Sequence, residues 1–250
     1  MQRYFLQKPY VEGKMVTISG DDFHHIVRVM RMKEGDMIYV VFPDHTSAQA
    51  KIETITSDDV EASVVKWETV LKELPISVAI ASGLPKGDKL EWVFQKGTEL
   101  GASRFIPFNA DRSIVKWDEK KAKKKLDRWE KIVKEAAEQS HRQQVPIVSS
   151  PLSLKNLLKD STLYDYKLVA YEEEAKAGEK GNFYHTLHEV KEGQSILVVF
   201  GPEGGLSEKE IKELKEAGFL LCGLGPRILR TETAPLYVLS AISYQFELMR

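Results

Sequence analysis

One stretch of the sequence decides the fold: LVVFGPEGGLSEKE, residues 197–210. It begins with an apolar run, passes through three glycines around a single carboxylate, and ends in a Ser-x-x-Glu pattern. The apolar run predicts a buried strand, and the pattern from Ser207 to Glu210 predicts a capping box that starts a helix. A strand that passes through a glycine turn into a helix is typical of an α/β domain with a parallel sheet.

A second junction of the same kind has the sequence LLCGLGPRILRTETA, residues 220–234. It predicts a strand, a tight Gly-Pro turn, and then the charged residues Arg230 and Glu232 ahead of a long apolar helix. In open parallel sheets, ligands bind at the carboxyl ends of strands, where such loops meet. Either turn alone is explained as a plain connection. Two charged turns in succession predict a ligand cleft.

Outward from these junctions, strand-like and helix-like segments alternate from residue 76 onward, which predicts a mainly parallel sheet with helices on both faces. The predicted strands are 76–82, 104–108, 167–171, 195–200 and 219–224, the predicted helices are 88–100, 118–141, 152–158, 207–216 and 233–249, and 143–153 is predicted to be a loop. Before residue 70, period-two alternation predicts a small β-barrel with one short helix at 21–32. We therefore predict an α/β protein with two domains, 1–72 and 73–250.

Composition and motifs exclude several classes of protein. Lys plus Arg (36) balance Asp plus Glu (37), so any contact with nucleic acid must come from a local basic face. The single cysteine, Cys222, excludes a disulfide framework and fits a reducing cytosol; we expect it in the core, not as a nucleophile. No apolar run is long enough to span a bilayer. No phosphate loop of the G-x-x-x-x-G-K-[ST] type occurs, and the nearest dinucleotide-type motif, at 223–228, lacks its third glycine.

The motifs FGPEGG (200–205) and LGPRILRTETA (224–234) together resemble the RsmE family, bacterial 16S rRNA uridine-N3 methyltransferases of the SPOUT superfamily. Four further segments fit the same family: HHIVRVMR (24–31), KGTELG (96–101), DRS (111–113) and EAAEQSHR (135–142). The resemblance covers nearly the whole chain in the right order.

The resemblance implies a PUA-like, RNA-binding β-barrel followed by a SPOUT-type α/β methyltransferase domain with a deep trefoil knot, made roughly from Ser195 to the C-terminal helix. It also implies S-adenosyl-L-methionine as methyl donor, a cytoplasmic homodimer, and the small ribosomal subunit as partner. The expected product is methylated at N3 of a specific uridine of 16S rRNA, uridine 1498 in standard numbering.

Glycine backbones near 201–205 and an apolar slot near 224–229 suit an adenosine, although several of these apolar residues also fit a plain core. With the resemblance, the predicted cofactor-binding residues are Tyr171, Val199, Gly201, Pro202, Glu203, Gly204, Leu224, Gly225, Ile228, Leu229, Arg230, Thr233 and Ala234.

Methylation at N3 requires removal of an imide proton and no covalent enzyme intermediate. Arg230 and Glu232 are the predicted catalytic residues, Arg230 to stabilise the uracil anion or to hold an RNA phosphate and Glu232 as general base. Glu203 and a hydroxide route stay open as alternatives to Glu232. An Arg230–Glu232 pair that only braces the loop is a structural alternative.

The predicted RNA contacts would bind phosphates without reading sequence. They are Arg3, His24, Arg28, Arg31, Arg112 and Arg142. His24 and His25 have no further ligand-type neighbours at metal spacing, so no metal site is expected.

Three other functions compete with this one. The first is a non-catalytic RNA-binding or ribosome-assembly protein, which would have no need of the glycine turns or of the Arg-Thr-Glu-Thr run. The second is a methyltransferase of the same fold that acts on a 2′-hydroxyl. The third is a nucleotide-binding metabolic enzyme, for which a phosphate loop would be expected.

Overall fold

The computed structural model describes residues 1–115, 119–172 and 181–249, and the chain divides into two compact units. The first comprises Met1–Glu73 together with Ala137–Gln144, and the second comprises Leu74–Ala136 and Val145–Arg250. The segment 137–144 therefore packs with the N-terminal unit, although it lies well beyond the predicted boundary at residue 72.

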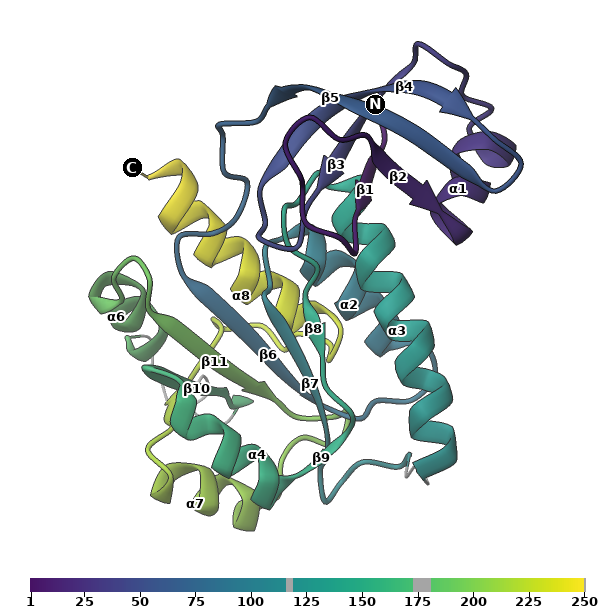
Figure 1. Ribbon diagram of the computed structural model, residues 1–250. Helices are drawn as coiled ribbons and strands as arrows, with labels where there is room; N and C mark the ends of the chain where they lie inside the picture. The colour runs from purple at the N-terminus through teal and green to yellow at the C-terminus, as the bar shows by residue number, and fades with distance from the viewer. Residues whose placement is uncertain (116–118, 173–180, 250) are drawn as a thin grey trace. The chain divides into compact units, whose positions relative to one another are not determined.

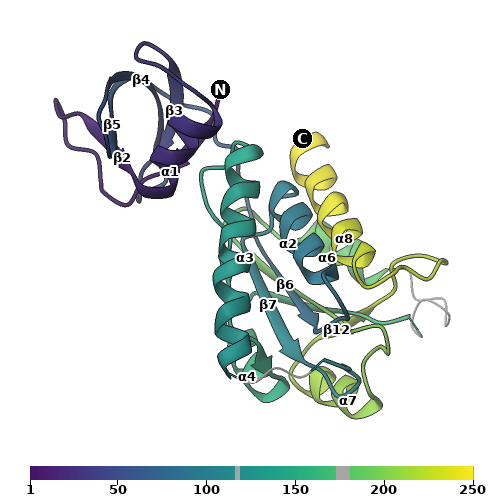
Figure 2. The same ribbon diagram turned by 90° about the vertical axis from the view of Figure 1, so that its right-hand side faces the viewer.

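The first unit is a curled five-stranded sheet with the order β1-β3-β4-β5-β2 (Figure 2). Its strands are β1 (Arg3–Phe5), β2 (Val16–Ser19), β3 (Met37–Val41), β4 (Ser47–Ile55) and β5 (Asp59–Trp67). β1 pairs with β3 in parallel, and the other pairs are antiparallel. Alternate residues of the strands, such as Ile38, Val40, Ile52 and Val60, are fully buried and form its core.

The predicted helix at 21–32 is shorter than expected. Helix α1 (Gly20–His24) passes into a π-helical turn, His25–Val29, and Arg31 has a left-handed φ of 52°. Arg31 therefore does not continue the helical face that carries His24 and Arg28. All three side chains are exposed.

Buried polar groups at one end of this unit correct two of the predicted RNA contacts. Arg3 is 1% exposed and pairs with Glu68, whose carboxylate also accepts a hydrogen bond from Ser47 Oγ at 2.7 Å. Arg142 is 3% exposed and pairs with Glu73. Both guanidiniums are thus enclosed by the fold with a carboxylate partner, so the prediction that they contact RNA is wrong for this conformation. A motif in the sequence shows that an arginine is present, and only the fold decides whether water or RNA can reach it.

The second unit contains a seven-stranded sheet (Figure 1). Six strands follow the order β12-β10-β11-β6-β7-β8, and the seventh, β9, pairs with β7. Every strand pair is parallel. The strands are β6 (Ser77–Gly83), β7 (Arg104–Asn109), β8 (Ile147–Val148), β9 (Leu152–Ser153), β10 (Tyr166–Ala170), β11 (Ser195–Phe200) and β12 (Leu220–Cys222). The predicted parallel sheet is confirmed. The two-residue strands β8 and β9 lie in the segment predicted to be a loop, and they are too short for a periodic signal.

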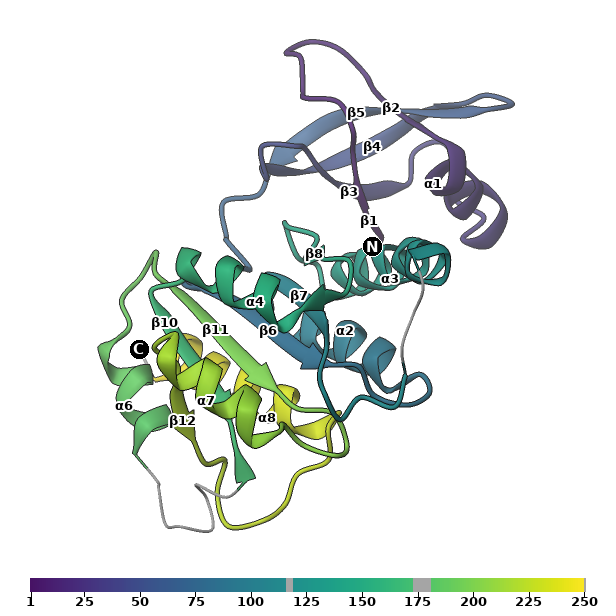
Figure 3. The ribbon, with the colours of Figure 1, turned by 90° about the horizontal axis from the view of Figure 1, so that it is seen from below.

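Helices cover both faces of this sheet (Figures 2 and 3). One apolar core includes residues of α2 (Lys89–Glu99), α3 (Glu119–Gln139), α6 (Asn182–Glu189) and α8 (Thr233–Ser243). The opposite core includes residues of α4 (Leu154–Asp160) and α7 (Glu208–Glu216). α8 runs on into a π-helical turn, Tyr244–Leu248, and a 3-10 turn, Ser161–Leu163, follows α4. Sequence periodicity missed α6, and Asp118, the first residue of the predicted third helix, lies outside the described residues.

Cys222 ends β12 and is completely buried in the first of these cores. The expectation of a core cysteine is confirmed. Within the described part of the chain, no helix is long and apolar enough to cross a membrane. The same residues contain no group of three or more His, Cys, Asp or Glu side chains arranged to hold a metal ion.

Breaking the buried Arg142–Glu73 pair tests its structural role. We expect Glu73→Ala to lower the free energy of unfolding by about 3–5 kcal/mol, because a buried guanidinium loses its carboxylate. Chemical denaturation followed by circular dichroism measures this loss. Glu12→Ala, at an exposed carboxylate of the same unit, should change the value by less than about 0.5 kcal/mol. Equal effects of the two substitutions would contradict a structural role for the pair.

Candidate functional site

The loop after β11 is shaped by close backbone packing. The N–H of Gly205 donates to the carbonyl of Pro202 at 2.8 Å, and Gly205 has φ +70°, which favours glycine. A Cβ on Gly201 would lie 2.9 Å from the carbonyl carbon of Gly205. At the end of β6, a Cβ on Gly83 would lie 2.6 Å from Cδ of Pro202. The loop therefore folds back on itself and against β6 in a way that side chains at these glycines would prevent.

A buried carboxylate anchors the same loop from the far side. Glu210 is 1% exposed, and its Oε2 accepts the N–H of Ser207 at 2.7 Å while the N–H of Glu210 donates to Ser207 Oγ at 3.2 Å. This is the predicted capping box, and the structure confirms it. Glu210 Oε1 also accepts the N–H of Asp111 at 2.9 Å. The start of α7 and the loop after β7 are thus held together by one side chain.

The second junction follows β12, which β10 separates from β11 in the sheet. Gly225 has φ +95°, and the chain then crosses the end of the sheet to reach α8. The carbonyl of Arg230 accepts the N–H groups of Thr233 at 2.8 Å and Ala234 at 3.0 Å, which starts the helix. Arg230 and Thr233 therefore shape the loop through their backbones.

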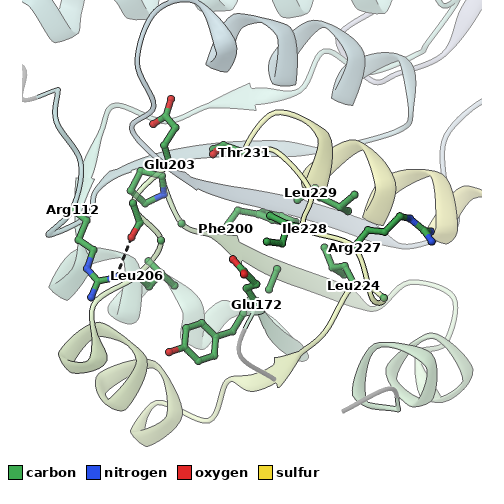
Figure 4. A pocket seen from close by; sticks show the side chains of 18 of the residues that line it. Arg112, Glu172, Phe200, Glu203, Leu206, Leu224, Arg227, Ile228, Leu229 and Thr231 are labelled. Carbon is green, nitrogen blue, oxygen red and sulfur yellow. Dashed lines mark hydrogen bonds between the residues drawn. The ribbon is translucent and has the colours of Figure 1, made fainter. Parts of the chain in front are cut away.

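The two junctions enclose a pocket of about 580 Å³ at the carboxyl ends of β10 and β11 (Figure 4). Ten of the predicted cofactor-binding residues line it: Tyr171, Gly201, Pro202, Glu203, Gly204, Leu224, Gly225, Ile228, Leu229 and Ala234. Arg112, predicted as an RNA contact, also lines it, and its Nη1 donates to the carbonyl of Gly204 at 3.0 Å. The volume lies within the range that is usual for sites of small organic ligands.

Four of the predicted cofactor-binding and catalytic residues lie outside the pocket lining: Val199, Arg230, Glu232 and Thr233. Val199 is completely buried in the sheet, on the side of the core that packs against α7, so its side chain cannot reach a ligand in the pocket. Arg230 and Thr233 are exposed, and Glu232 precedes α8 beside Lys89. The sequence of the strand shows only a run of apolar residues, so it could not tell that Val199 is buried in the core and does not face the pocket.

Charged residues meet beside the pocket. Lys89 Nζ donates to Glu203 Oε1 at 2.8 Å and lies 3.9 Å from Glu232 Oε2. Burial raises the pKa of Glu203, but hydrogen bonds from Lys89 and from the N–H of Lys86 outweigh it, so the pKa lies below its ordinary value. Glu203 is therefore held as a carboxylate, and it is a weak proton acceptor near neutral pH.

Sequence reasoning missed several lining residues. They are Ala170, Glu172, Phe200, Leu206, Glu208, Arg227 and Thr231, while Gly205 was noted only as part of the glycine turn. Phe200, Arg227 and Thr231 lie within the two quoted motifs, and Ala170 and Glu172 flank the predicted Tyr171, so most of them were one position from a predicted residue. Lys89 had no such signal, because it is distant in sequence from both junctions.

The chain is similar to known RNA methyltransferases in both sequence and structure. A family model described as an RNA methyltransferase domain matches residues 72–243, and one described as an RNA methyltransferase PUA domain matches residues 18–65. A Bacillus subtilis protein named ribosomal RNA small subunit methyltransferase E is 54% identical, with 100% of this chain and 99% of that protein covered. A Synechocystis protein of the same name is 31% identical, covering 93% of this chain and 74% of that protein.

Two solved structures carry a bound ligand. One is a ribosomal RNA small subunit methyltransferase E from Neisseria gonorrhoeae bound to S-adenosyl methionine, with 29% identity, 98% of each chain covered and a TM-score of 0.85. The other is a methyltransferase from Legionella pneumophila in complex with the cofactor SAM, with 30% identity, 96% of each chain covered and a TM-score of 0.84.

Removing the anchoring carboxylate tests how the loop is held. We expect Glu210→Ala to lower the free energy of unfolding by about 2–4 kcal/mol, because the capping box and the acceptor for two backbone N–H groups are lost. Glu213→Ala, on the same helix, loses only a surface pair with Lys209 and should cost less than about 0.5 kcal/mol. Denaturation curves of both variants measure the difference, and similar midpoints would show that Glu210 does not anchor the loop.

Proposed function

The chain belongs to the ribosomal RNA small subunit methyltransferase E family and is an rRNA methyltransferase with S-adenosylmethionine as its cofactor, and from this premise we propose that it methylates N3 of uridine 1498 of 16S rRNA. The observation that carries this proposal is the pocket between the two junction loops, with a buried carboxylate oxygen of Glu232 beside it. Modification of a ring nitrogen requires a proton acceptor at the site, and Glu232 supplies one.

We propose that the cofactor binds in this pocket. The glycine loop forms one wall with backbone that carries no side chains at Gly201, Gly204 and Gly205. Leu224, Ile228 and Leu229 form an apolar wall. The carboxylates of Glu172 and Glu203 also line it and suit a ligand that carries positive charge. The residues present therefore fit the cofactor. When bound, it supplies a methyl group on a positively charged sulfur, which becomes a neutral thioether after transfer.

The protein's own residues then have to remove one proton and stabilise one negative charge. In the proposed reaction, Glu232 accepts the proton from N3 of the uracil, and the electron pair left on N3 forms the new bond to the methyl carbon. Arg230, exposed two residues earlier, stabilises the charge on the uracil oxygens. Glu203 is a poorer base, because it accepts two hydrogen bonds and its pKa is lowered.

We propose that exposed basic side chains bind the RNA. We retain Arg112 at the pocket and His24, Arg28 and Arg31 on the N-terminal unit as RNA contacts, since all four side chains are exposed. In this assignment the PUA-like domain, residues 1–72, holds rRNA while residues 73–250 carry out the chemistry. Loss of affinity for small subunits in Arg28→Ala, at unchanged stability, would support this role, and unchanged affinity would exclude Arg28.

The family resemblance also leads us to propose a cytoplasmic homodimer and a knotted chain. Exposed apolar side chains on α2 and on the C-terminal helix support the dimer: Trp92, Tyr237, Tyr244 and Leu248. Light scattering after size exclusion should give twice the mass of 28.4 kDa. We further propose that the segment from Ser195 onward forms a deep trefoil knot, which a crystal structure with an unthreaded trace of that segment would exclude.

The decisive experiment incubates the protein and a labelled cofactor with small subunits from a bacterial strain without an enzyme of this family. Digestion to nucleosides and mass spectrometry should show labelled N3-methyluridine. Primer extension should then stop at uridine 1498, because an N3 methyl group removes the Watson–Crick donor. Labelled 2′-O-methyluridine would support the competing reaction, and no label on rRNA would support the non-catalytic function.

Blocking the glycine wall tests the cofactor site. A Cβ on Gly204 would lie 3.1 Å from Cβ of Arg112, so we expect the branched side chain of Gly204→Val to crowd the wall and weaken S-adenosylmethionine binding at least about tenfold, or about 1.4 kcal/mol. Calorimetric titration measures the affinity. Ser150→Val, at an exposed position outside the pocket lining, is the control and should bind like the wild type.

Removing the proposed base tests the chemistry separately from binding. We expect Glu232→Gln to lower kcat by about 10²–10⁴-fold while the cofactor Kd changes less than about threefold. Single-turnover assays with small subunits, alongside calorimetry, give both quantities. Full turnover with unchanged affinity would remove Glu232 from this role.

A further inference from the structure

Lys89 connects segments that are far apart in the sequence. It is the first residue of α2, and its half-buried side chain carries an ammonium that donates to Glu203 in the glycine loop at 2.8 Å. The same ammonium lies 3.9 Å from Glu232, at the start of α8. One cation therefore faces carboxylates from both loops that enclose the pocket.

The two carboxylates are held differently. Glu203 Oε1 accepts hydrogen bonds from Lys89 Nζ at 2.8 Å and from the backbone N–H of Lys86 at 3.1 Å. Glu232 Oε2 is buried and, among the described residues, accepts no hydrogen bond, because 3.9 Å is too long for one. The Lys89 ammonium thus acts on Glu232 by charge alone and leaves its lone pairs available.

The Lys89 side chain is held in its protonated, positively charged form. The hydrogen bond to Glu203, opposed by a smaller effect of burial, raises the pKa of the Lys89 ammonium. The positive charge of Arg230 acts in the opposite direction on Lys89. The charged groups that act on Lys89 are therefore Glu203 from the glycine loop, and Glu232 and Arg230 from the loop before α8.

We propose that Lys89 is a positioning residue for methyl transfer: its ammonium ties the glycine loop to the loop before α8, and it holds the Glu232 carboxylate in place without a hydrogen bond. This inference rests on the proposed function for the role of Glu232, whereas the tie between the loops stands without it. Lys89 acts through the two carboxylates and need not touch the substrate.

Two measurements follow from this role. Lys89→Met should weaken cofactor binding about three- to tenfold, because the glycine loop loses its tie to α2. The ammonium also holds the Glu232 carboxylate in place, so its removal should lower kcat at saturating cofactor and rRNA about tenfold, which the loss of the loop tie alone would not do. Lys89→Arg keeps the charge and should restore most of both properties. Lys96→Met, which removes a lysine paired with Glu99 on the same helix, is the control and should behave like the wild type.

A double-mutant cycle separates the possible outcomes. In a Glu232→Gln background, Lys89→Met should no longer lower kcat but should still weaken cofactor binding. An unchanged kcat and an unchanged Kd in folded Lys89→Met would overturn the proposal. A loss of binding that Lys89→Arg does not restore would overturn the charge-based tie. If the wild type makes no N3-methyluridine, the proposed function fails, while the Kd of Lys89→Met still decides whether the tie exists.

Discussion

All loops that line the pocket leave the large sheet at the same edge, because every strand pair in that sheet is parallel. β11 is hydrogen-bonded on both sides, to β10 and to β6, and Ile196–Phe200 are buried on both faces. Such a strand has no face for polar side chains, so the polar and flexible residues of this segment are concentrated where the strand ends. The position of the pocket is a direct consequence of this arrangement.

The glycine loop satisfies a second constraint, which is close backbone approach. Gly83 and Gly201 lie where a Cβ would come within 3 Å of neighbouring atoms, so the end of β6 and the turn after β11 pack backbone to backbone. The compact turn then places Gly204 and Gly205 on the wall of the pocket. Buried Glu210 completes the arrangement from the opposite side, where its carboxylate holds the loop that carries Arg112.

The charged residues divide into two groups by the degree of burial. Arg3, Arg142 and Glu210 are almost completely enclosed and have carboxylate or backbone partners, as the cost of burying an unpaired charge requires. Lys89 and Glu203 are about one-third exposed at the pocket, where a charge can respond to a ligand. The first group stabilises the fold, and the second is in a position to take part in the chemistry.

The sequence by itself determined the parallel sheet, the capping box at Ser207 and Glu210, both junction loops and most of the pocket lining, because each depends on residues that are close together along the chain. Only the tertiary structure decided that Arg3 and Arg142 are buried, that Val199 faces a core, and that segment 137–144 packs with the N-terminal unit. It alone brought Lys89 to Glu203 and Glu232, across more than 100 residues of sequence. Local patterns encode hydrogen bonds and periodicity within an element, whereas burial and long-range charge contacts exist only after the elements have packed.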